Sequence, residues 1–243
     1  MKKTIVALLI MMGLMITGCS REEPVEKHTR ILCYGDSNTY GYNPYTSLRY
    51  EEDKIWTNIL NDRLGEDYTV INAGMNGRTT AYDVFGSFLV NGMNSLDECL
   101  RENVPLDMVI FMLGTNDCNA MLHLSADDIG IGMEKLIIET KDKTMEYQGY
   151  VPEIMVIVPG AIKDNIEGSV FANDFDREAI EKSRELSSVY RKLSDKHDCL
   201  YLDASDRVDV SDVDCVHLSE KGHEQLSLLV YGMIVDGGNY DKD

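Results

Sequence analysis

From residue 30 onward, the most apolar parts of this 243-residue chain are five short runs, which are separated by longer stretches of mixed character. The runs contain no charged side chain and cover residues 31–34, 68–71, 108–113, 154–158 and 199–202. Runs of this kind are typical of parallel strands that are buried on both faces of a sheet. The pattern therefore predicts a sheet of about five parallel strands.

Most of the connecting stretches have apolar residues three and four positions apart, which is the spacing of amphipathic helices. The predicted helices cover residues 55–64, 83–101, 125–140, 176–196 and 219–233. Gly86 and Gly92 weaken the second of these patterns. The alternation of strands and helices predicts one α/β domain over residues 30–236, followed by a polar tail at residues 237–243.

The first 18 residues have the pattern of an export signal. Lys2 and Lys3 precede an apolar run over residues 5–16, which is shorter than a membrane-spanning helix. The run leads to Ile-Thr-Gly before Cys19, and this ending resembles a bacterial lipobox. The resemblance implies an exported protein that is anchored to the cell envelope membrane by lipid on Cys19, with residues 19–29 as a polar tether. The alternative is a conventional signal peptide with an incidental cysteine.

The net charge and the cysteine content exclude several kinds of partner and of structural site. The formal net charge is −19 and no basic cluster stands out, so nucleic acid and anionic lipid are poor partners. Apart from Cys19, five cysteines remain, an odd number without a CxxC pair. Neither a disulfide framework nor a zinc site is predicted. Nothing in the pattern specifies an oligomeric state.

Two polar residues follow apolar runs at the same distance. Ser37 lies three residues after Tyr34, and Asn116 lies three residues after Leu113. Because ligands bind at the carboxyl ends of strands in open α/β sheets, both side chains are expected at one edge of the sheet. Ser37 is therefore a candidate nucleophile, although an ordinary strand-to-helix turn would use the same residue types for capping.

Three further residues supply what a serine nucleophile needs. A serine hydroxyl requires a base, and His217 suits this role. Asp214 is three residues earlier and close enough to accept the Nδ1–H of His217. Acyl transfer also needs donors for the oxyanion, and we assign the Ser37 N–H, the Gly77 N–H and the Asn116 side-chain amide.

In this order the motifs resemble the four blocks of the SGNH (GDSL) hydrolase superfamily, over residues 30–232. The blocks are Gly35-Asp36-Ser37-Asn38-Thr39, Asn72-Ala73-Gly74-Met75-Asn76-Gly77, Gly114-Thr115-Asn116-Asp117 and Asp214-Cys215-Val216-His217. The Gly-Asp-Ser-Asn-Thr-x-Gly opening and the Arg-Thr-Thr at residues 78–80 are similar to the arylesterase and carbohydrate-esterase branch. The resemblance implies a three-layer α/β/α fold with a flavodoxin-like sheet. Cys215 departs from the superfamily, which often has glycine there.

These observations predict a serine esterase without metal or cofactor. It would remove short acyl groups, above all acetyl, from sugars or small alcohols through an acyl-enzyme, and it could also transfer acyl groups to alcohols. A longer-chain lipase or lysophospholipase, a thioesterase and a non-catalytic binding or scaffold lipoprotein are the alternatives. A metallophosphoesterase is disfavoured, because five scattered histidines are too few for a two-metal site. Residues 159–175 are interpreted as a lid or a tolerated insertion.

Overall fold

The computed structural model describes residues 28–237. The predicted export signal, Cys19, most of the tether and the end of the polar tail lie outside the described residues.

Five parallel strands form the central sheet, as predicted. They are β1 (Thr29–Gly35), β2 (Tyr68–Gly74), β5 (Met108–Met112), β6 (Glu153–Val158) and β7 (Leu200–Asp203), in the spatial order β2-β1-β5-β6-β7. This is the flavodoxin-like order, in which the first strand lies beside both the second and the third. Gly35 pairs with Gly74 on one side and Met112 on the other, so three strands end at the same level.

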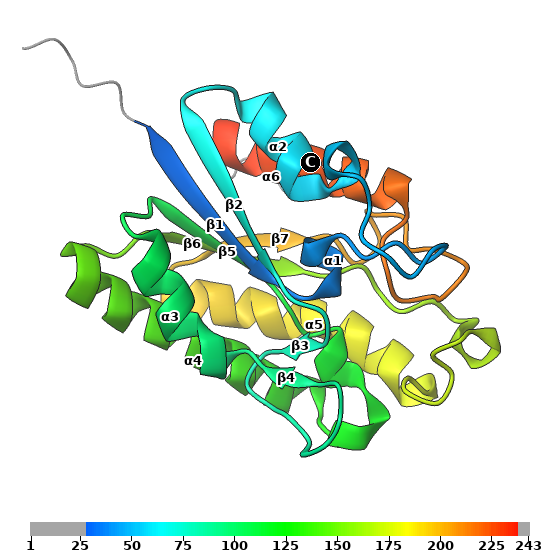
Figure 1. The fold of residues 1–243 in the computed structure, drawn as a ribbon. Helices are drawn as coiled ribbons and strands as arrows, with labels where there is room; N and C mark the ends of the chain where they lie inside the picture. The colour runs from blue at the N-terminus through cyan, green and yellow to red at the C-terminus, as the bar shows by residue number, and fades with distance from the viewer. Residues whose placement is uncertain (1–27, 238–243) are drawn as a thin grey trace, which may run out of the picture.

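Helices cover both faces of the sheet, giving three layers (Figure 1). The helices α2 (Trp56–Leu64) and α6 (Glu220–Val235) lie on one face, and α3 (Met93–Asn103), α4 (Ala126–Gln148) and α5 (Arg177–His197) lie on the other. Each face of the sheet has its own hydrophobic core, and successive residues of a strand point into one core and then the other. In β1, Leu32 and Tyr34 pack in one core, and Ile31 and Cys33 pack in the other. The charge-free runs in the three central strands β1, β5 and β6 are therefore buried from both directions, whereas those in the edge strands β2 and β7 are partly exposed.

The prediction of one helix over residues 83–101 was wrong at its beginning, because α3 starts only at Met93. The preceding residues form an irregular loop between the short strands β3 (Arg78–Thr79) and β4 (Val90–Asn91). Gly92 allows this path: a Cβ at this position would lie 2.6 Å from the carbonyl oxygens of Thr79 and Thr80. The two strands thus come too close for any residue but glycine.

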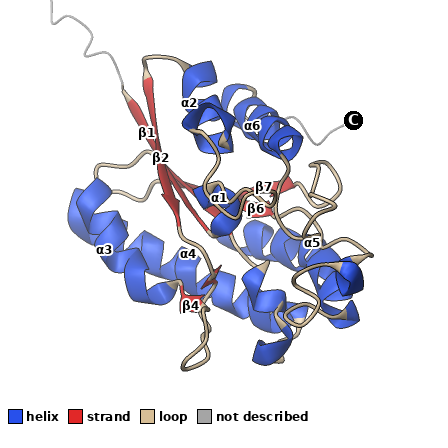
Figure 2. Cartoon of the chain, turned by 45° about the vertical axis from the view of Figure 1, so that its right-hand side comes forward, coloured by secondary structure: helices blue, strands red, loops and turns tan. Residues whose placement is uncertain are grey.

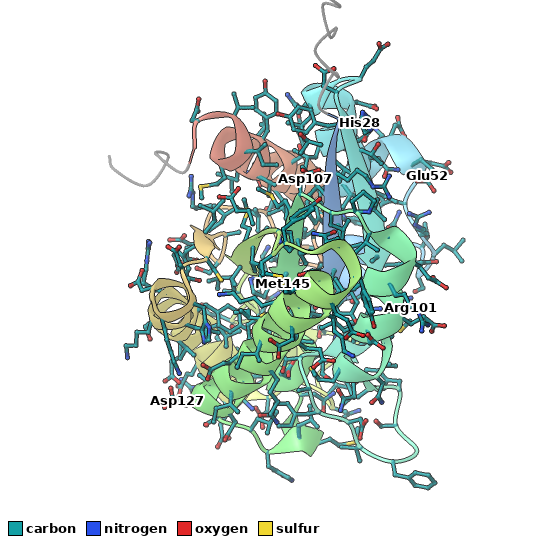
Figure 3. The ribbon with its side chains drawn as sticks, turned by 90° about the vertical axis from the view of Figure 1, so that its left-hand side faces the viewer. His28, Glu52, Arg101, Asp107, Asp127 and Met145 are labelled. Atoms are coloured by element: carbon teal, nitrogen blue, oxygen red, sulfur yellow. The ribbon has the colours of Figure 1, made fainter. Side chains whose placement is uncertain are left out.

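Short helices occupy the loops at the carboxyl edge of the sheet. They are α1 (Ser37–Tyr40), η1 (Glu52–Lys54), η2 (Asn116–Cys118), η3 (Ala120–Leu122) and η4 (Ile166–Gly168). Figure 2 shows the concentration of loops at this end of the molecule. Figure 3 shows His28 and Asp107, which precede β1 and β5, far from Asp127 at the beginning of α4. The chain therefore enters the sheet at one edge and carries its short helices at the other.

No helix within residues 28–237 is long and apolar enough to cross a bilayer. The five cysteines in this part of the chain are free thiols. Trp56 is completely buried and packs in the core that α2 and α6 cover.

Candidate active site

Ser37 is the first residue of α1, a single helical turn that begins where β1 ends. The Asp36 carboxylate caps this turn by accepting the Asn38 N–H at 2.8 Å. Gly35 has no room for a side chain, because a Cβ would lie 2.9 Å from the Met112 carbonyl oxygen and closer still to the Thr39 side chain. The sharp turn presents the Ser37 hydroxyl at the carboxyl edge of the sheet.

His217 and Asp214 complete a hydrogen-bonded chain with this hydroxyl. The His217 Nε2 lies 2.8 Å from Ser37 Oγ, and its Nδ1 lies 2.7 Å from Asp214 Oδ2. Asp214 Oδ1 also accepts the N–H groups of His217 and Val216. Burial alone would raise the pKa of Asp214, but these hydrogen bonds and the charge of His217 outweigh it and hold the pKa below its usual value. Asp214 is therefore ionised at neutral pH.

The loop that carries His217 is shaped by an unusual residue. Cys215 has φ 66°, in the left-handed region that favours glycine, and its side chain is buried. The superfamily's frequent glycine at this position therefore has a conformational reason. Asn38 then joins the base loop to the nucleophile turn, because its Oδ1 accepts the Leu218 N–H at 2.8 Å.

Gly77 and Asn116 line the same pocket as Ser37 and His217. Gly77 has φ 75°, and a Cβ there would lie 2.4 Å from the Phe88 carbonyl oxygen. Asn116 donates one Nδ2 hydrogen to the Arg78 carbonyl oxygen at 3.0 Å, which orients the amide. The structure thus brings together all five site residues chosen from the sequence, from four separate loops.

Arg78 supports these loops from beneath. Its guanidinium donates to the carbonyl oxygens of Gly35, at 2.8 Å, and of Ala73, and lies 3.9 Å from the centroid of the Tyr34 ring. Burial lowers its pKa. The Arg78 side chain therefore holds the ends of β1 and β2 together and does not face the pocket, whose lining does not include it.

Two buried carboxyl groups lie beside the proposed reactive residues. Burial raises the pKa of Asp36 to about 6, against the opposing influence of the Asn38 N–H and of the charges of His217 and Arg78. Burial likewise raises the pKa of Asp117 to about 7, although Thr80 donates both its N–H and its hydroxyl to this carboxyl. Asp117 thereby ties the Asn116 turn to the loop that follows Gly77.

The pocket has a volume of about 240 Å³, and its lining is mainly apolar. Besides the site residues, its lining comprises Tyr42, Asn76, Phe88, Phe171, Phe175 and Val216. Phe171 and Phe175 come from residues 159–175, so that segment forms one wall of the pocket. The aromatic residues lie in loops without a periodic pattern, so nothing in the sequence marks them for the pocket; only Tyr42 lies close to a motif.

The other histidines are not part of the hydrogen-bonded chain of Ser37, His217 and Asp214. His223 is buried, and burial together with the nearby His217 lowers its pKa to about 3, so its ring stays neutral. His197 contacts Glu134 on the far side of the α4 and α5 pair, and His123 is exposed. Within residues 28–237, no three His, Cys, Asp or Glu side chains are grouped so as to hold a metal ion.

The pocket at the carboxyl edge of this flavodoxin-like sheet contains Ser37, Gly77, Asn116 and His217, which is the residue set of the SGNH class of hydrolases. The model of the GDSL-like Lipase/Acylhydrolase family matches residues 33–225, and the chain belongs to this family. A comparison with curated proteins finds no match.

Solved structures of esterases have the same fold. A carbohydrate acetylesterase from Sinorhizobium meliloti is 31% identical, with a TM-score of 0.79 over 86% of this chain and 99% of the other. The aryl esterase of M. smegmatis, in an inhibitor-bound form, is 30% identical, with the same TM-score and coverage. A lipase/acylhydrolase from Enterococcus faecalis, at 20% identity and a TM-score of 0.60, covers 85% of this chain and 95% of its own and shares the fold. The protein is thus a carboxylic ester hydrolase.

Proposed function

We propose that this protein is a serine esterase that removes short acyl groups, above all acetyl, from sugars or small alcohols. The observation that carries the proposal is the contact of Ser37 Oγ with His217 Nε2 at 2.8 Å, at the wall of a pocket that also contains Gly77 and Asn116. The chemistry follows from this arrangement in two half-reactions.

In the first half-reaction, Ser37 Oγ attacks the ester carbonyl carbon while His217 Nε2 takes its proton. Asp214 accepts the Nδ1–H, which fixes the tautomer of the ring and stabilises the imidazolium. The tetrahedral intermediate then collapses: the bond to the alcohol oxygen breaks, and His217 returns the proton to that oxygen. The alcohol leaves, and the acyl group remains on Ser37.

In the second half-reaction, His217 takes a proton from water, and the resulting attack on the acyl carbon releases the acid and restores Ser37. Another alcohol that enters in place of water would instead receive the acyl group. In both halves the carbonyl oxygen becomes negatively charged and needs preorganised donors. The Ser37 N–H, the Gly77 N–H and the second Nδ2 hydrogen of Asn116 supply them.

The size of the pocket favours a short acyl group. Sites for drug-sized ligands usually enclose about 300–1,000 Å³, whereas this pocket encloses about 240 Å³. Its bulky walls, Phe88, Phe171 and Phe175, leave little room beyond the reacting ester for a long chain. The acetylesterase and aryl esterase neighbours support the same choice.

A hydrolysis panel from acetyl to long-chain esters, with acetylated polysaccharides included, tests the proposal. We expect the highest kcat/KM for acetyl esters, covalent labelling of Ser37 by a fluorophosphonate, and no activity of Ser37→Ala. Preference for long chains would identify a lipase instead. Equal activity of the wild type and Ser37→Ala would refute the serine mechanism and favour a binding or scaffold role.

We also propose that the protein is exported and anchored by lipid on Cys19, on the strength of the lipobox-like ending of the apolar run. Labelling of the full chain with a radioactive fatty acid in a bacterial host tests this. The wild type is expected to incorporate the label and to fractionate with membranes. A Cys19→Ser variant that is labelled equally would refute the assignment.

A further inference from the structure

Tyr42 contacts the catalytic histidine directly. The centroid of its ring lies 4.3 Å from the centroid of the His217 ring, with 35° between the two planes. The Tyr42 ring thus packs against the imidazole in a tilted arrangement, at a distance that leaves no room for a substrate group between them. Phe171 also approaches His217, but its ring is farther away, at 5.7 Å, and steeply inclined at 59°.

The position of Tyr42 is set by the backbone of the nucleophile. The Ser37 carbonyl oxygen accepts the N–H groups of both Gly41 and Tyr42 at 3.0 Å. Gly41, with φ 91°, turns the chain at the end of α1, and a Cβ there would lie 2.7 Å from the Ile55 side chain. Tyr42 also forms an isolated antiparallel bridge with Arg49. Its ring is therefore held against His217 by the same turn that carries Ser37.

The Tyr42 ring acts on the positive charge that His217 acquires during the reaction. In the proposed reaction the imidazole is neutral before proton transfer and positively charged in the transition state. The face of an aromatic ring attracts a cation within about 6 Å of its centroid, and the attraction grows when the pair is shielded from water. His217 is only 6% exposed. An interaction that is stronger in the transition state than in the ground state lowers the barrier.

From this geometry we infer that Tyr42 is a positioning residue, which keeps the His217 imidazole in line with Ser37 Oγ and stabilises the imidazolium form. The inference rests on the proposed function, since it requires His217 to act as the base. The ring, and not the hydroxyl, carries the effect: within the described part of the chain, no hydrogen bond involves the Tyr42 hydroxyl. Phenylalanine should therefore replace tyrosine, and an aliphatic residue should not.

Kinetics of Tyr42→Leu and Tyr42→Phe with an acetyl ester test the inference. We expect Tyr42→Leu to lower kcat about tenfold with a smaller change in KM, and Tyr42→Phe to recover most of that loss. Tyr45→Leu is the matched control, because Tyr45 lies in the same loop, is 67% exposed and does not line the pocket. This control should retain the kcat of the wild type, and circular dichroism should show that all three variants are folded.

A second series separates charge from shape. Phenylalanine analogues with one, two, three and five ring fluorines at position 42 progressively weaken the attraction of the ring face for a cation, with little change in size. We expect kcat to fall stepwise along the series. A flat series would overturn the electrostatic part of the inference, and Tyr42→Phe as slow as Tyr42→Leu would overturn the assignment to the ring. A change confined to KM would make Tyr42 a substrate contact only and would also overturn it.

Ser37→Ala distinguishes this inference from the proposed function. Substantial activity of Ser37→Ala would refute the serine mechanism itself. If Ser37→Ala is inactive while Tyr42→Leu keeps the kcat of the wild type, the serine mechanism stands and only the role of Tyr42 is refuted.

Discussion

Replacement of Asp117 by asparagine should change how the stability of the protein depends on pH. Asp117 is fully buried, and burial raises its pKa from 3.8 to about 7. A carboxyl whose pKa is raised by folding binds more protons in the folded state than in the unfolded state. The free energy of unfolding therefore falls as the pH rises from the pKa of Asp117 in the unfolded state to its pKa in the folded state. Outside that range, the contribution of Asp117 to stability does not change with pH.

The size of the effect follows from the shift. A rise of about 3 units corresponds to about 4 kcal/mol in total, at about 1.4 kcal/mol per unit. Of this, about 2.5 kcal/mol is lost between pH 5 and pH 8. Asparagine cannot ionise, so the variant should lack this part of the pH dependence. The substitution also weakens the hydrogen bonds from Thr80, and this lowers the free energy of unfolding of the variant at pH 5 and at pH 8 alike. The change in the free energy of unfolding between the two pH values therefore reports only the titration of Asp117.

Urea unfolding of the wild type and Asp117→Asn at pH 5 and pH 8 provides the measurement. Asp62→Asn serves as the control, because this exposed carboxyl should leave the pH difference of the wild type unchanged. Asp36, whose pKa is raised to about 6, also loses stabilising free energy as the pH rises, and it does so in the wild type and in both variants. If Asp117→Asn lost as much stability between the two pH values as the wild type does, the assignment of a raised pKa to Asp117 would be wrong.

Three further predictions concern the pocket. Gly77→Ala should lower stability by at least about 1–2 kcal/mol in chemical denaturation, because of its positive φ and the 2.4 Å approach to the Phe88 carbonyl oxygen. The variant keeps the backbone N–H, but the strained loop should shift this donor away from the oxyanion and lower kcat by about 100-fold; an unchanged kcat would show that turnover does not depend on the exact position of this loop. Asp214→Asn should lower kcat about 10,000-fold in the ester assay, although Ser37 is unchanged. A loss below tenfold would argue against stabilisation of the His217 imidazolium by Asp214. Phe171→Ala should raise the ratio of kcat/KM for butyryl esters to kcat/KM for acetyl esters about tenfold, because the two additional methylenes would be buried at about 0.8 kcal/mol each. An unchanged ratio would show that this wall of the pocket does not limit the length of the acyl chain.

The sheet was predictable because its signal is local and one-dimensional. Strands buried on both faces need apolar residues at every position, and β5 and β6 show this directly in the sequence. The beginning of α3 was not predictable in the same way. The helical spacing before Met93 is genuine, but Gly92 is needed for a close approach of two segments, and that approach exists only in the folded chain.

The reactive residues were accessible from sequence because each follows a strand at a fixed offset or belongs to a short motif. Ser37 and Asn116 share the same spacing from their strands, and strand ends in a parallel sheet meet at one edge. The residues that shape the pocket had no such signal. Phe171 reaches His217 across 46 positions of sequence, through a loop whose path depends on tertiary contacts, such as the one between the Lys163 N–H and the Cys215 carbonyl oxygen.

The direction of β1 determines which end of the domain a tether at the N-terminal side would hold. His28 and Thr29 lie where this strand begins, and Ser37 lies just beyond where it ends, so the attachment point and the reactive hydroxyl occupy opposite poles. Eight residues lie between Cys19 and His28, and the nine steps from one Cα to the next along this segment span at most about 30 Å when the chain is fully extended. If Cys19 carries a lipid, the beginning of β1 is the part of the domain nearest to the anchor, and the Ser37 pocket lies at the far end of that strand.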